Sequence, residues 1–404
     1  MLILAWRNLW RNKRRTLITA ASVFFAVFFA ILLRGFHAGT WSYLIDSVLH
    51  SYTGYIQVHT KDFWENKSFD YSMAADNPAL EKIKGIKGVK GLIPRIESFS
   101  LASYGDKTKG VITVGIDPMI ENNFSALDKK IVRGRYFHEK DTGIILSERL
   151  ANFLKVKVND SLVLLSQGYQ GASANGVFRI IGIVKLPAPE FDNQMVYMPL
   201  SAAQEFYSMQ SRHTSVIVDI DNPQKMDKIT KHIAKSIDTK SFEVMTWEDM
   251  LVELYQQYVS DEGGGVIMLV LLYIIVGFGV FGTVLMMISE RRHEYAIMIA
   301  LGMQRSSLLK LVGTELFYIC FIGVLFGTAF SLPIITYFHF HPLQISGNLA
   351  DVYAAFGMEP LLPVAWRTDY IIQQAINVTG IVAIVLLYPI YSVYKLDLTK
   401  AIRR

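Results

Sequence analysis

The residues best suited to holding a partner protein lie in one short connection, residues 290–304, which reads ERRHEYAIMIALGMQ. Charged side chains open this connection, an apolar run follows, and Gly302 comes where a helix would stop. The pattern predicts a short amphipathic helix in which Arg291, Arg292 and Glu294 are available to a partner. Taken alone, such a segment is more often a solvated loop helix, so its neighbours must decide.

Motifs for catalysis are missing from the sequence. No G-x-x-x-x-G-K-[S/T] occurs and the dipeptide Gly-Lys is absent, so the chain cannot build a standard phosphate-binding P-loop. H-E-x-x-H, C-x-x-C and G-x-S-x-G are also absent. His339 and His341 flank Phe340, but two histidines without a third ligand are typical of a loop. We expect no catalytic residue, no metal site and no cofactor bound by this chain.

Polar residues are also rare inside the long apolar segments, where an ion-coupled carrier needs them. Glu315 lies near one end of such a segment, beside Lys310, and is either paired or extends outwards. A few amides, Gln373, Gln374 and Asn377, lie near the end of another. The energy source therefore lies outside these segments.

The composition indicates a membrane protein. The chain has 404 residues, of which 51% are hydrophobic and 19% charged. The net charge is +5, and much of the basic excess lies beside the apolar segments. This placement is expected of membrane topology and does not indicate a nucleic-acid-binding surface. Cys320 is the single cysteine, so no disulfide can form within the chain.

Four segments are long enough and apolar enough to cross a bilayer. A cleaved signal peptide is the alternative for the first, but Arg34 and His37 follow it where a small-residue cleavage site would lie. The predicted spans are residues 16–37, 263–289, 308–337 and 370–394.

The charges of the short connections set the orientation. Basic residues are dense in residues 1–15, 290–307 and 395–404, whereas Arg367 is the only Lys or Arg in residues 338–369. The positive-inside rule then predicts cytoplasmic termini, a cytoplasmic 290–307 connection and an outer loop at 338–369. The long segment 38–262 is predicted to lie outside the cytoplasm.

Segment 38–262 has strand and helix patterns throughout, which predicts a mixed α+β domain of one or two subdomains. Asp76 and Ser201 are expected to cap two of its helices. The predicted strands are 55–59, 110–115, 161–165, 177–184, 195–198 and 215–220, and the predicted helices are 77–84, 201–208, 223–236 and 247–259.

The two ends of this domain are predicted to be helices that run into the first two spans. They are residues 40–50 and 247–262, and they form either a stalk that transmits motion or interfacial helices anchored by Trp41 and Trp247. We expect the triplet Gly263, Gly264 and Gly265 to break the second helix, as a hinge or as a loose junction.

Three stretches of the sequence resemble a known family. They are AWRNLWRNKRRTLIT at residues 5–19, SERRHEYAIMIALGMQRSSLLKLVGTELFY at 289–318 and YPIYSVYKLDLTKAIRR at 388–404. They are similar to the basic first helix, the coupling signature and the closing helix of the FtsX-like (MacB/Lol-type) ABC transporter permeases, also called type VII or mechanotransmission systems. One span, a large domain and three further spans is that family's own arrangement. The coupling signature falls on Glu290, Arg291, Glu294, Ala300, Gly302 and Glu315.

The resemblance implies partners and a location. Two permease subunits, identical or homologous, would sit on two copies of a separate P-loop ATPase, which uses ATP and Mg. Gly279-x-x-x-Thr283 is a weak signal for packing between permeases. The membrane would be a bacterial inner membrane, with the large domain periplasmic. The residues implied in ATPase coupling are Glu290, Arg291, Arg292, Glu294, Ala300 and Gly302.

The resemblance is greatest to the lipoprotein-releasing (LolC/LolE-like) branch, partly because of GYIQVH at residues 54–59. Members of that branch use a long hairpin arm to recruit a periplasmic carrier. The matching stretch here, residues 166–177 with Gln167, Tyr169 and Gln170, is short and predicts a plain tight hairpin, with a docking loop as the alternative. The expected function is ATP-driven release of lipoproteins or another envelope substrate. The alternative is a signalling subunit that activates a cell-wall hydrolase or senses peptides.

Overall fold

The computed structural model describes residues 2–11, 13–138, 141–348, 350, 353 and 360–395. The predicted tail, residues 395–404, lies outside the described residues from 396 onwards. The chain divides into two compact units. The membrane unit comprises Met1–Tyr43, Tyr258–Ile345 and Leu361–Arg404, and the sheet unit comprises Leu44–Gln257 and Ser346–Pro360.

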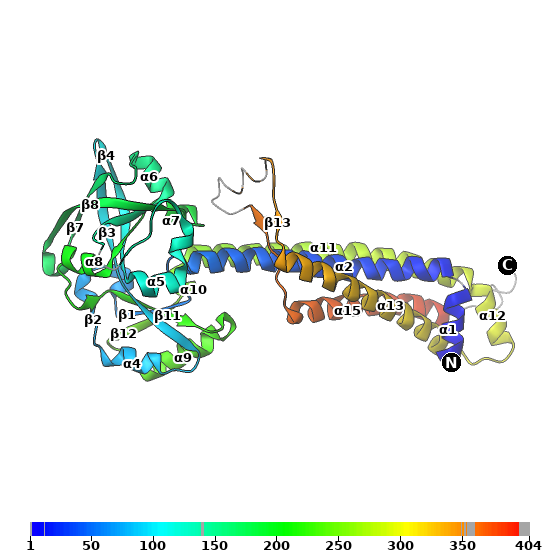
Figure 1. Cartoon of the computed structure of the whole chain (residues 1–404). Helices are drawn as coiled ribbons and strands as arrows, with labels where there is room; N and C mark the ends of the chain where they lie inside the picture. Colours follow the sequence, from blue (N-terminus) through cyan, green and yellow to red (C-terminus); the bar gives the residue numbers. More distant parts are fainter. Residues whose placement is uncertain are drawn as a thin grey trace. The chain divides into compact units, whose positions relative to one another are not determined.

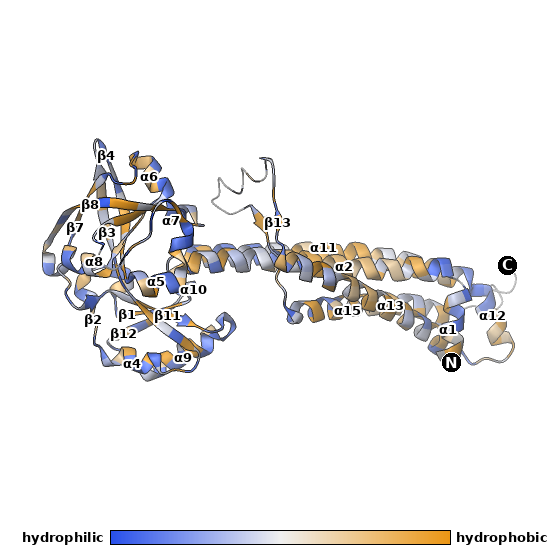
Figure 2. Ribbon diagram, viewed as in Figure 1, coloured by the Kyte–Doolittle hydropathy of each residue, from blue (hydrophilic) through white to orange (hydrophobic). Residues whose placement is uncertain are grey.

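The membrane unit is built from long helices, four of which are long enough and apolar enough to cross a membrane (Figure 1). Their residues are hydrophobic over most of their length (Figure 2), which is the pattern of helices that meet lipid or one another on every side. A two-stranded sheet joins β13 to β14. The elements are α1 (Leu2–Arg11), α2 (Lys13–Leu49), α11 (Val252–Glu290), α12 (Arg292–Ala300), α13 (Arg305–Phe340), β13 (Leu343–Gln344), β14 (Leu361–Leu362) and α15 (Thr368–Tyr394).

Helices α2 and α13 approach each other closely because α13 has glycines at the contact. A Cβ atom at Gly323 would lie 2.6 Å from Val23, and one at Gly327 would lie 2.9 Å from the carbonyl oxygen of Phe24. This small-residue spacing is a common device for close packing of membrane helices. At Gly279, in the motif that the sequence suggested for packing, an added Cβ would meet no other element of the described chain within 4 Å.

The predicted helix break at Gly263, Gly264 and Gly265 is wrong, because α11 runs without interruption from Val252 to Glu290. Glycine in a helix costs only about 1 kcal/mol relative to alanine, which a long apolar helix can absorb. The break lies earlier, at Leu251, which separates α10 (Trp247–Met250) from α11 and has φ −115° and ψ 57°.

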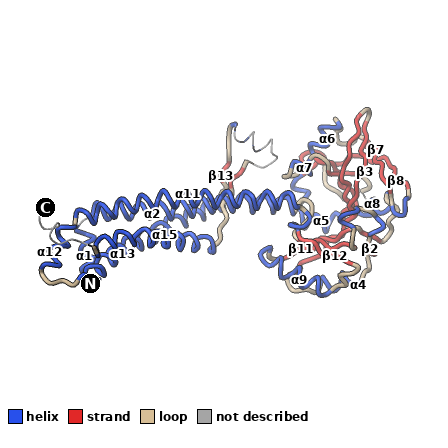
Figure 3. The backbone as a smooth tube through the Cα atoms, turned by 180° about the vertical axis from the view of Figure 1, so that it is seen from behind, coloured by secondary structure: helices blue, strands red, loops and turns tan. Residues whose placement is uncertain are grey.

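The sheet unit contains one mixed ten-stranded sheet in its described residues, seen as the concentration of strands in Figure 3. The order is β12-β1-β11-β3-β4-β9-β6-β8-β5, and β7 pairs with both β3 and β8. The pairs β4–β9 and β6–β8 are parallel and the others are antiparallel. The strands are β1 (Ile56–Thr60), β3 (Val89–Tyr104), β4 (Lys107–Ile116), β5 (Ile131–Gly134), β6 (Ile144–Ser147), β7 (Ser161–Gln167), β8 (Ser173–Val184), β9 (Met195–Pro199), β11 (Ser215–Ile220) and β12 (Phe242–Thr246); β2 (Met73–Ala74) and β10 (Arg212–His213) form a separate pair.

Part of this sheet closes on itself. Strand β3 pairs with β11 through its first half and with β7 through its second half. Because β7 also pairs with β8, the strands β3, β4, β9, β6, β8 and β7 form a ring around an apolar core that includes Ile96, Leu146, Leu164 and Met198. The strands β11, β1 and β12 continue outwards from the first half of β3.

Short helices cover the sheet. Helices α4, α9 and α10 pack on the β1–β11 part through a core that includes Ile83, Ile233 and Trp247. Helices α6 and α8 pack on the ring of six strands. They are α3 (Phe63–Asn66), α4 (Pro78–Lys84), α5 (Pro118–Ser125), α6 (Glu148–Leu154), α7 (Pro189–Asp192), α8 (Leu200–Phe206) and α9 (Met226–Ser236), with the 3₁₀ turns η1 (Phe69–Tyr71), η2 (Leu127–Lys130), η3 (Tyr169–Gly171) and η4 (Pro223–Lys225).

The predicted fold class, four apolar helices with an α+β domain between the first and second, is confirmed. Both predicted caps are wrong. Asn77, not Asp76, caps α4 by accepting the N–H of Ala79 at 2.9 Å, and α8 begins at Leu200 so that Ser201 lies inside it. Trp247 is 6% exposed in the core of the sheet unit, which excludes it as a membrane-interface anchor.

Candidate functional site

The connection that the sequence singled out folds as α12, a helix of nine residues between two long helices. Its end is set by Gly302, whose φ of +99° is strained for any other residue and whose N–H donates to the carbonyl of Ile299 at 3.0 Å. The helix and its glycine stop agree with the prediction. Ala300 is the exposed last residue of the helix.

Arg291 fixes the start of α12 to the rest of the membrane unit. Its side chain is 4% exposed and donates to the Glu315 carboxylate on α13, with Nη1–Oε2 at 2.5 Å. Asn8 on α1 donates to the other oxygen of Glu315 at 2.7 Å. The guanidinium also lies 5.1 Å from the ring centroid of buried Tyr295. A buried charge is costly unless it is paired, so this network joins α1, α12 and α13 in one arrangement.

A second layer of ion pairs surrounds this network at the surface. Arg11 donates to Glu294 at 2.7 Å, and Arg291 approaches the same carboxylate at 3.3 Å. Arg15 pairs with Glu290, the last residue of α11. Two basic residues of the first helices thus pair with Glu290 and Glu294 beside α12. Glu290, Arg291 and Glu294 each form an ion pair within this chain.

Apolar side chains are exposed on one side of α12 and at its end. Leu301 is 84% exposed and Ile297, four residues earlier, is 42% exposed; Arg292 and Ala300 are also exposed. Burial of an exposed leucine against a partner would be favourable, because it removes apolar surface from water. Of the six predicted coupling residues, Arg292, Ala300 and Gly302 are exposed.

A polar cluster joins α2 and α11 within the membrane unit. Arg34 forms a two-bond ion pair with Glu262. Asp261 accepts from the Trp41 indole at 2.5 Å and contacts His37 Nε2 at 2.8 Å. Gly265 lies under the His37 ring, where an added Cβ would be 3.1 Å from Nε2. The glycine triplet thus includes one position that needs a small residue and two, Gly263 and Gly264, that meet nothing within 4 Å.

The end of α2 is held firmly inside the sheet unit. Arg95 is fully buried, donates twice to Glu121 at 2.6 and 2.9 Å, and also donates to the carbonyl of Tyr52. The Tyr197 hydroxyl donates to the carbonyl of Ser51 at 3.1 Å. Cations and donors satisfy carbonyls that have no helical partner after a helix ends. Movement of this end of α2 would therefore be passed to β3 and α5.

The predicted docking hairpin is the turn between β7 and β8. The Arg212 guanidinium lies over the Tyr169 ring in a cation–π contact, with its central carbon 5.0 Å from the ring centroid. The backbone N–H of Tyr169 donates to the carbonyl of Tyr207 at 2.8 Å. Gln167 and Gln170 are exposed, and Gln170 is left-handed with φ 52°. The turn is held against its own domain as a tight hairpin, and it presents two glutamines.

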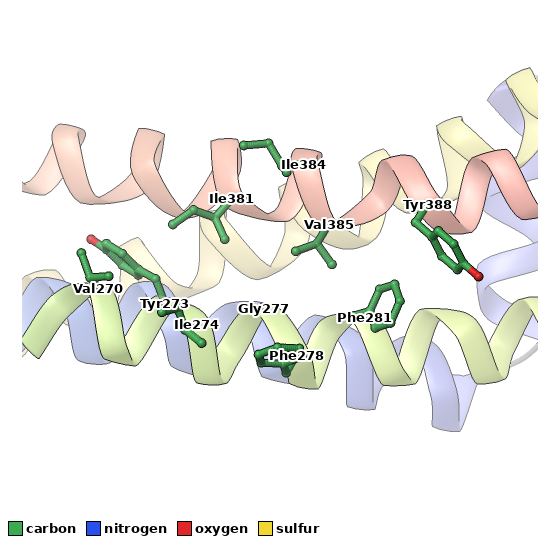
Figure 4. A pocket seen from close by; sticks show the side chains of 10 residues that line it. All are labelled: Val270, Tyr273, Ile274, Gly277, Phe278, Phe281, Ile381, Ile384, Val385 and Tyr388. Carbon is green, nitrogen blue, oxygen red and sulfur yellow. The ribbon is translucent and has the colours of Figure 1, made fainter.

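An apolar groove of about 560 Å³ lies between α11 and α15 (Figure 4). Figure 4 shows the rings of Phe281 and Tyr388 at one end and Tyr273 at the other, where the Tyr273 hydroxyl donates to Gln374. The groove has the chemistry of a surface covered by lipid chains. No group of three or more metal-ligating side chains occurs in the described residues, and His339 instead contacts the Val364 carbonyl at 2.8 Å.

Comparison with known proteins identifies the family. A family model described as the MacB-like periplasmic core domain matches residues 16–236, more than half of the chain. A second, described as the FtsX-like permease C-terminal region, matches residues 266–398. The chain belongs to the MacB/FtsX-like family of ABC transporter permeases. The second match includes both α12 and Glu315, the buried partner of Arg291.

Named relatives of this permease fall into two groups. It is 20% identical to the lipoprotein-releasing system transmembrane protein LolC of Neisseria meningitidis, over 73% of this chain and 70% of that protein. It is 22% identical to LolE of Haemophilus influenzae over 62% of each chain. It is also 22% identical to the macrolide export ATP-binding/permease protein MacB of Rhodopseudomonas palustris, over 70% of this chain and 44% of that protein.

Solved structures similar to this permease include the periplasmic region of MacB from Actinobacillus actinomycetemcomitans, with 15% identity and a TM-score of 0.34. That match covers 50% of this chain and 93% of the MacB chain. The predicted family is confirmed by the sequence comparisons.

The sequence did not predict several residues that build these contacts. Asn8, Arg34, Asp261 and Glu262 carry no motif, and their partners lie more than 200 positions away along the chain. The density of basic residues before the first span was a usable signal for Arg11 and Arg15, but it indicated topology alone.

Proposed function

We propose that this permease is the membrane subunit of an ATP-driven complex in a bacterial inner membrane. A separate ABC ATPase binds the outward side of α12, and closure of two ATPase copies moves α12 together with α2 and α11. The large domain, on the periplasmic side, changes shape in response. A second permease subunit, identical or homologous, completes the complex, and ATP and Mg are used by the ATPase.

The observation that carries this proposal is the two-sided character of α12. Its inner side is locked to α1 and α13 through Arg291, Glu315 and Asn8, whereas its outer side exposes Ile297 and Leu301. A force applied to the outer side is transmitted to the bundle because the inner side is held by buried charged hydrogen bonds. A solvated loop helix has no need of such an anchor.

The proposed cargo is a lipoprotein or another envelope substrate, in keeping with the names of the LolC and LolE relatives. The groove between α11 and α15 is lined mainly by apolar side chains, which suits lipid chains and offers no polar path for the protein part of such cargo. Work done on the periplasmic side is enough for release of a lipid-anchored protein.

The test is co-purification of the ATPase with matched surface variants. The tagged permease is purified from its native membranes, and the P-loop ATPase that accompanies it is quantified by mass spectrometry and by ATP hydrolysis. We expect near-equal amounts with the wild type and at least a tenfold loss with Leu301→Asp, because a desolvated charge at an interface centre costs more than about 1.4 kcal/mol, a factor of ten.

Ser306→Asp is the control, because Ser306 is exposed in the first turn of α13, outside α12, and the substitution adds the same charge. It should retain the ATPase. Equal recovery with Leu301→Asp and Ser306→Asp, or no ATPase with the wild type, would contradict the proposal. Gly302 is a poor test position because its backbone strains any other residue. A co-purified lipoprotein would support release, and a cell-wall hydrolase or sensor kinase would support signalling.

A further inference from the structure

The sheet unit contains a cavity of about 610 Å³ between the end of α2, α3 and the α10–α11 junction. Cavities that bind small molecules have volumes of roughly 300–1,000 Å³. One wall is aliphatic, and α3 and the turn after it supply an aromatic ring and a cation. The residues that line this cavity include Leu44, Leu251, Leu254, Trp64, Lys67 and Glu253.

Lys67 is an unsatisfied cation in this cavity. Its Nζ atom is buried, and in the described part of the chain it has no hydrogen-bond partner. It lies 3.1 Å from the ring centroid of Trp64, a cation–π contact that replaces only part of the lost hydration. Burial lowers the pKa of Lys67 to about 8. An ammonium group held in this way is the natural counter-ion of an anionic ligand.

The described residues do not supply that anion. Glu97 on β3 is the acid that attracts Lys67, but it is not within ion-pair distance, and its Oε2 atom is itself buried without a partner. Its other oxygen accepts from Ser215 at 3.0 Å and from Gln57 at 3.4 Å. The carboxylate is thus directed to β1 and β11, and the buried ammonium of Lys67, a residue that lines the cavity, has no ion-pair partner in the described residues.

The same cavity also carries acidic side chains, namely Glu190, Asp249 and Glu253. None of the three is a hydrogen-bond partner of Lys67 Nζ in the described residues, and they come from α7, α10 and α11, whereas Lys67 follows α3. The cavity thus has a buried cation on one element and carboxylates on others. Aliphatic side chains, including Leu44, line the rest.

We propose that this cavity binds a small zwitterion with an apolar body, of the size of a dipeptide or tripeptide. The ligand's carboxylate pairs with Lys67, its apolar groups pack against Leu44, Leu251 and Leu254, and its ammonium group is held by Glu190 and Glu253. The site involves neither the ATPase nor a second permease, so it stands whether or not the proposed function is correct. Because Leu251 is the break between α10 and α11, a bound ligand would contact the point where that helix pair bends.

The test is calorimetric titration of the full-length permease in lipid nanodiscs with trileucine and with trileucine amide, which lacks the carboxylate. We expect the wild type to bind trileucine at least tenfold more tightly than the amide. Lys67→Met should erase that difference, since the variant retains the length of the side chain and loses its charge. A difference that persists in Lys67→Met, or equal binding of both ligands by the wild type, would overturn the proposal.

A second arm tests the acidic part with N-acetyl-trileucine, which lacks the ammonium group. The wild type should bind it at least threefold more weakly than trileucine, and Glu190→Gln/Glu253→Gln should bind the two equally. Octanoate is the probe for a plain fatty carboxylate. If the wild type binds octanoate more tightly than trileucine, the zwitterion assignment is wrong.

Discussion

Two buried cations of the sheet unit, Arg95 and Lys67, meet the same physical problem with opposite outcomes. Arg95 is fully buried and makes two hydrogen bonds to Glu121 and one to the Tyr52 carbonyl. Lys67 Nζ is buried with an aromatic ring beside it and no hydrogen bond in the described residues. The first arrangement is complete and holds the end of α2 in place. The second lacks a hydrogen-bond acceptor for the ammonium group among these residues, and in the proposed site the carboxylate of a bound ligand supplies it.

The largest expected effect comes from breaking the complete arrangement. Arg95→Met leaves Glu121 charged and fully buried, and loss of one partner of a buried pair costs about 3–5 kcal/mol. We expect the thermal unfolding midpoint of the sheet unit to fall by about 10 °C. Unfolding is monitored by tryptophan fluorescence of the permease in nanodiscs. Arg95→Met/Glu121→Met should recover most of the loss. A single variant as stable as the wild type would show that the pair does not hold the fold.

Removing the charge of Lys67 is expected to stabilise the protein, whereas removing that of Arg95 destabilises it. Lys67→Met is expected to raise the free energy of unfolding at pH 7 by about 1–2 kcal/mol, because the wild type keeps a charge that burial disfavours and that Trp64 compensates only in part. The same nanodisc measurement checks this. A loss of stability would show that Lys67 is a structural group.

The pH dependence of that gain follows from the pKa of Lys67, which is about 8 in the folded protein and 10.5 in the unfolded chain. Below pH 8 both states are charged and the folded state has the full penalty. Between pH 8 and 10.5 the unfolded state holds more protons, so the wild type gains stability as pH rises. The advantage of Lys67→Met should therefore shrink across this window and vanish above it.

The smallest effect on stability is expected at an exposed ion pair. Such a pair shows how much a cation contributes when it is not buried. Arg11 and Glu294 are 54% and 44% exposed and lie 2.7 Å apart. Arg11→Gln should change stability by less than about 1 kcal/mol at physiological salt, since exposed ion pairs are screened and cost side-chain entropy. An effect as large as that of Arg95→Met would mean that Arg11 supports the buried Arg291–Glu315 pair.

The sequence predicted those parts of the fold in which apolar residues follow a simple period. The four long helices and six of the strands were found this way, and so was the stop at Gly302. Strand β3 was missed, although it is the longest in the sheet, because Arg95, Glu97 and Ser100 point into the protein. Buried polar residues remove the alternation on which such a prediction depends.

The sequence predicted where the candidate site lies along the chain, but not which of its side chains are buried and which are exposed. The pattern of residues 290–304 indicated a helix, yet it could not assign Arg291 to the inside and Leu301 to the outside. That assignment depends on Glu315 and Asn8, which reach Arg291 from other helices. Likewise, three consecutive glycines predicted a break that the long apolar helix overrides, and the space needed by the His37 ring at Gly265 has no signature in the sequence.

The closed ring of strands also affects how neighbouring molecules behave. Strands within the ring have partners on both sides, and the order of the described strands ends at β12 and β5, which have only five and four residues. Long unpaired edges are templates on which other chains add strands and aggregate. Membrane proteins are confined to two dimensions and meet one another often. With such short edges, these domains can collide repeatedly and separate again, which is what the proposed movement of the large domain requires.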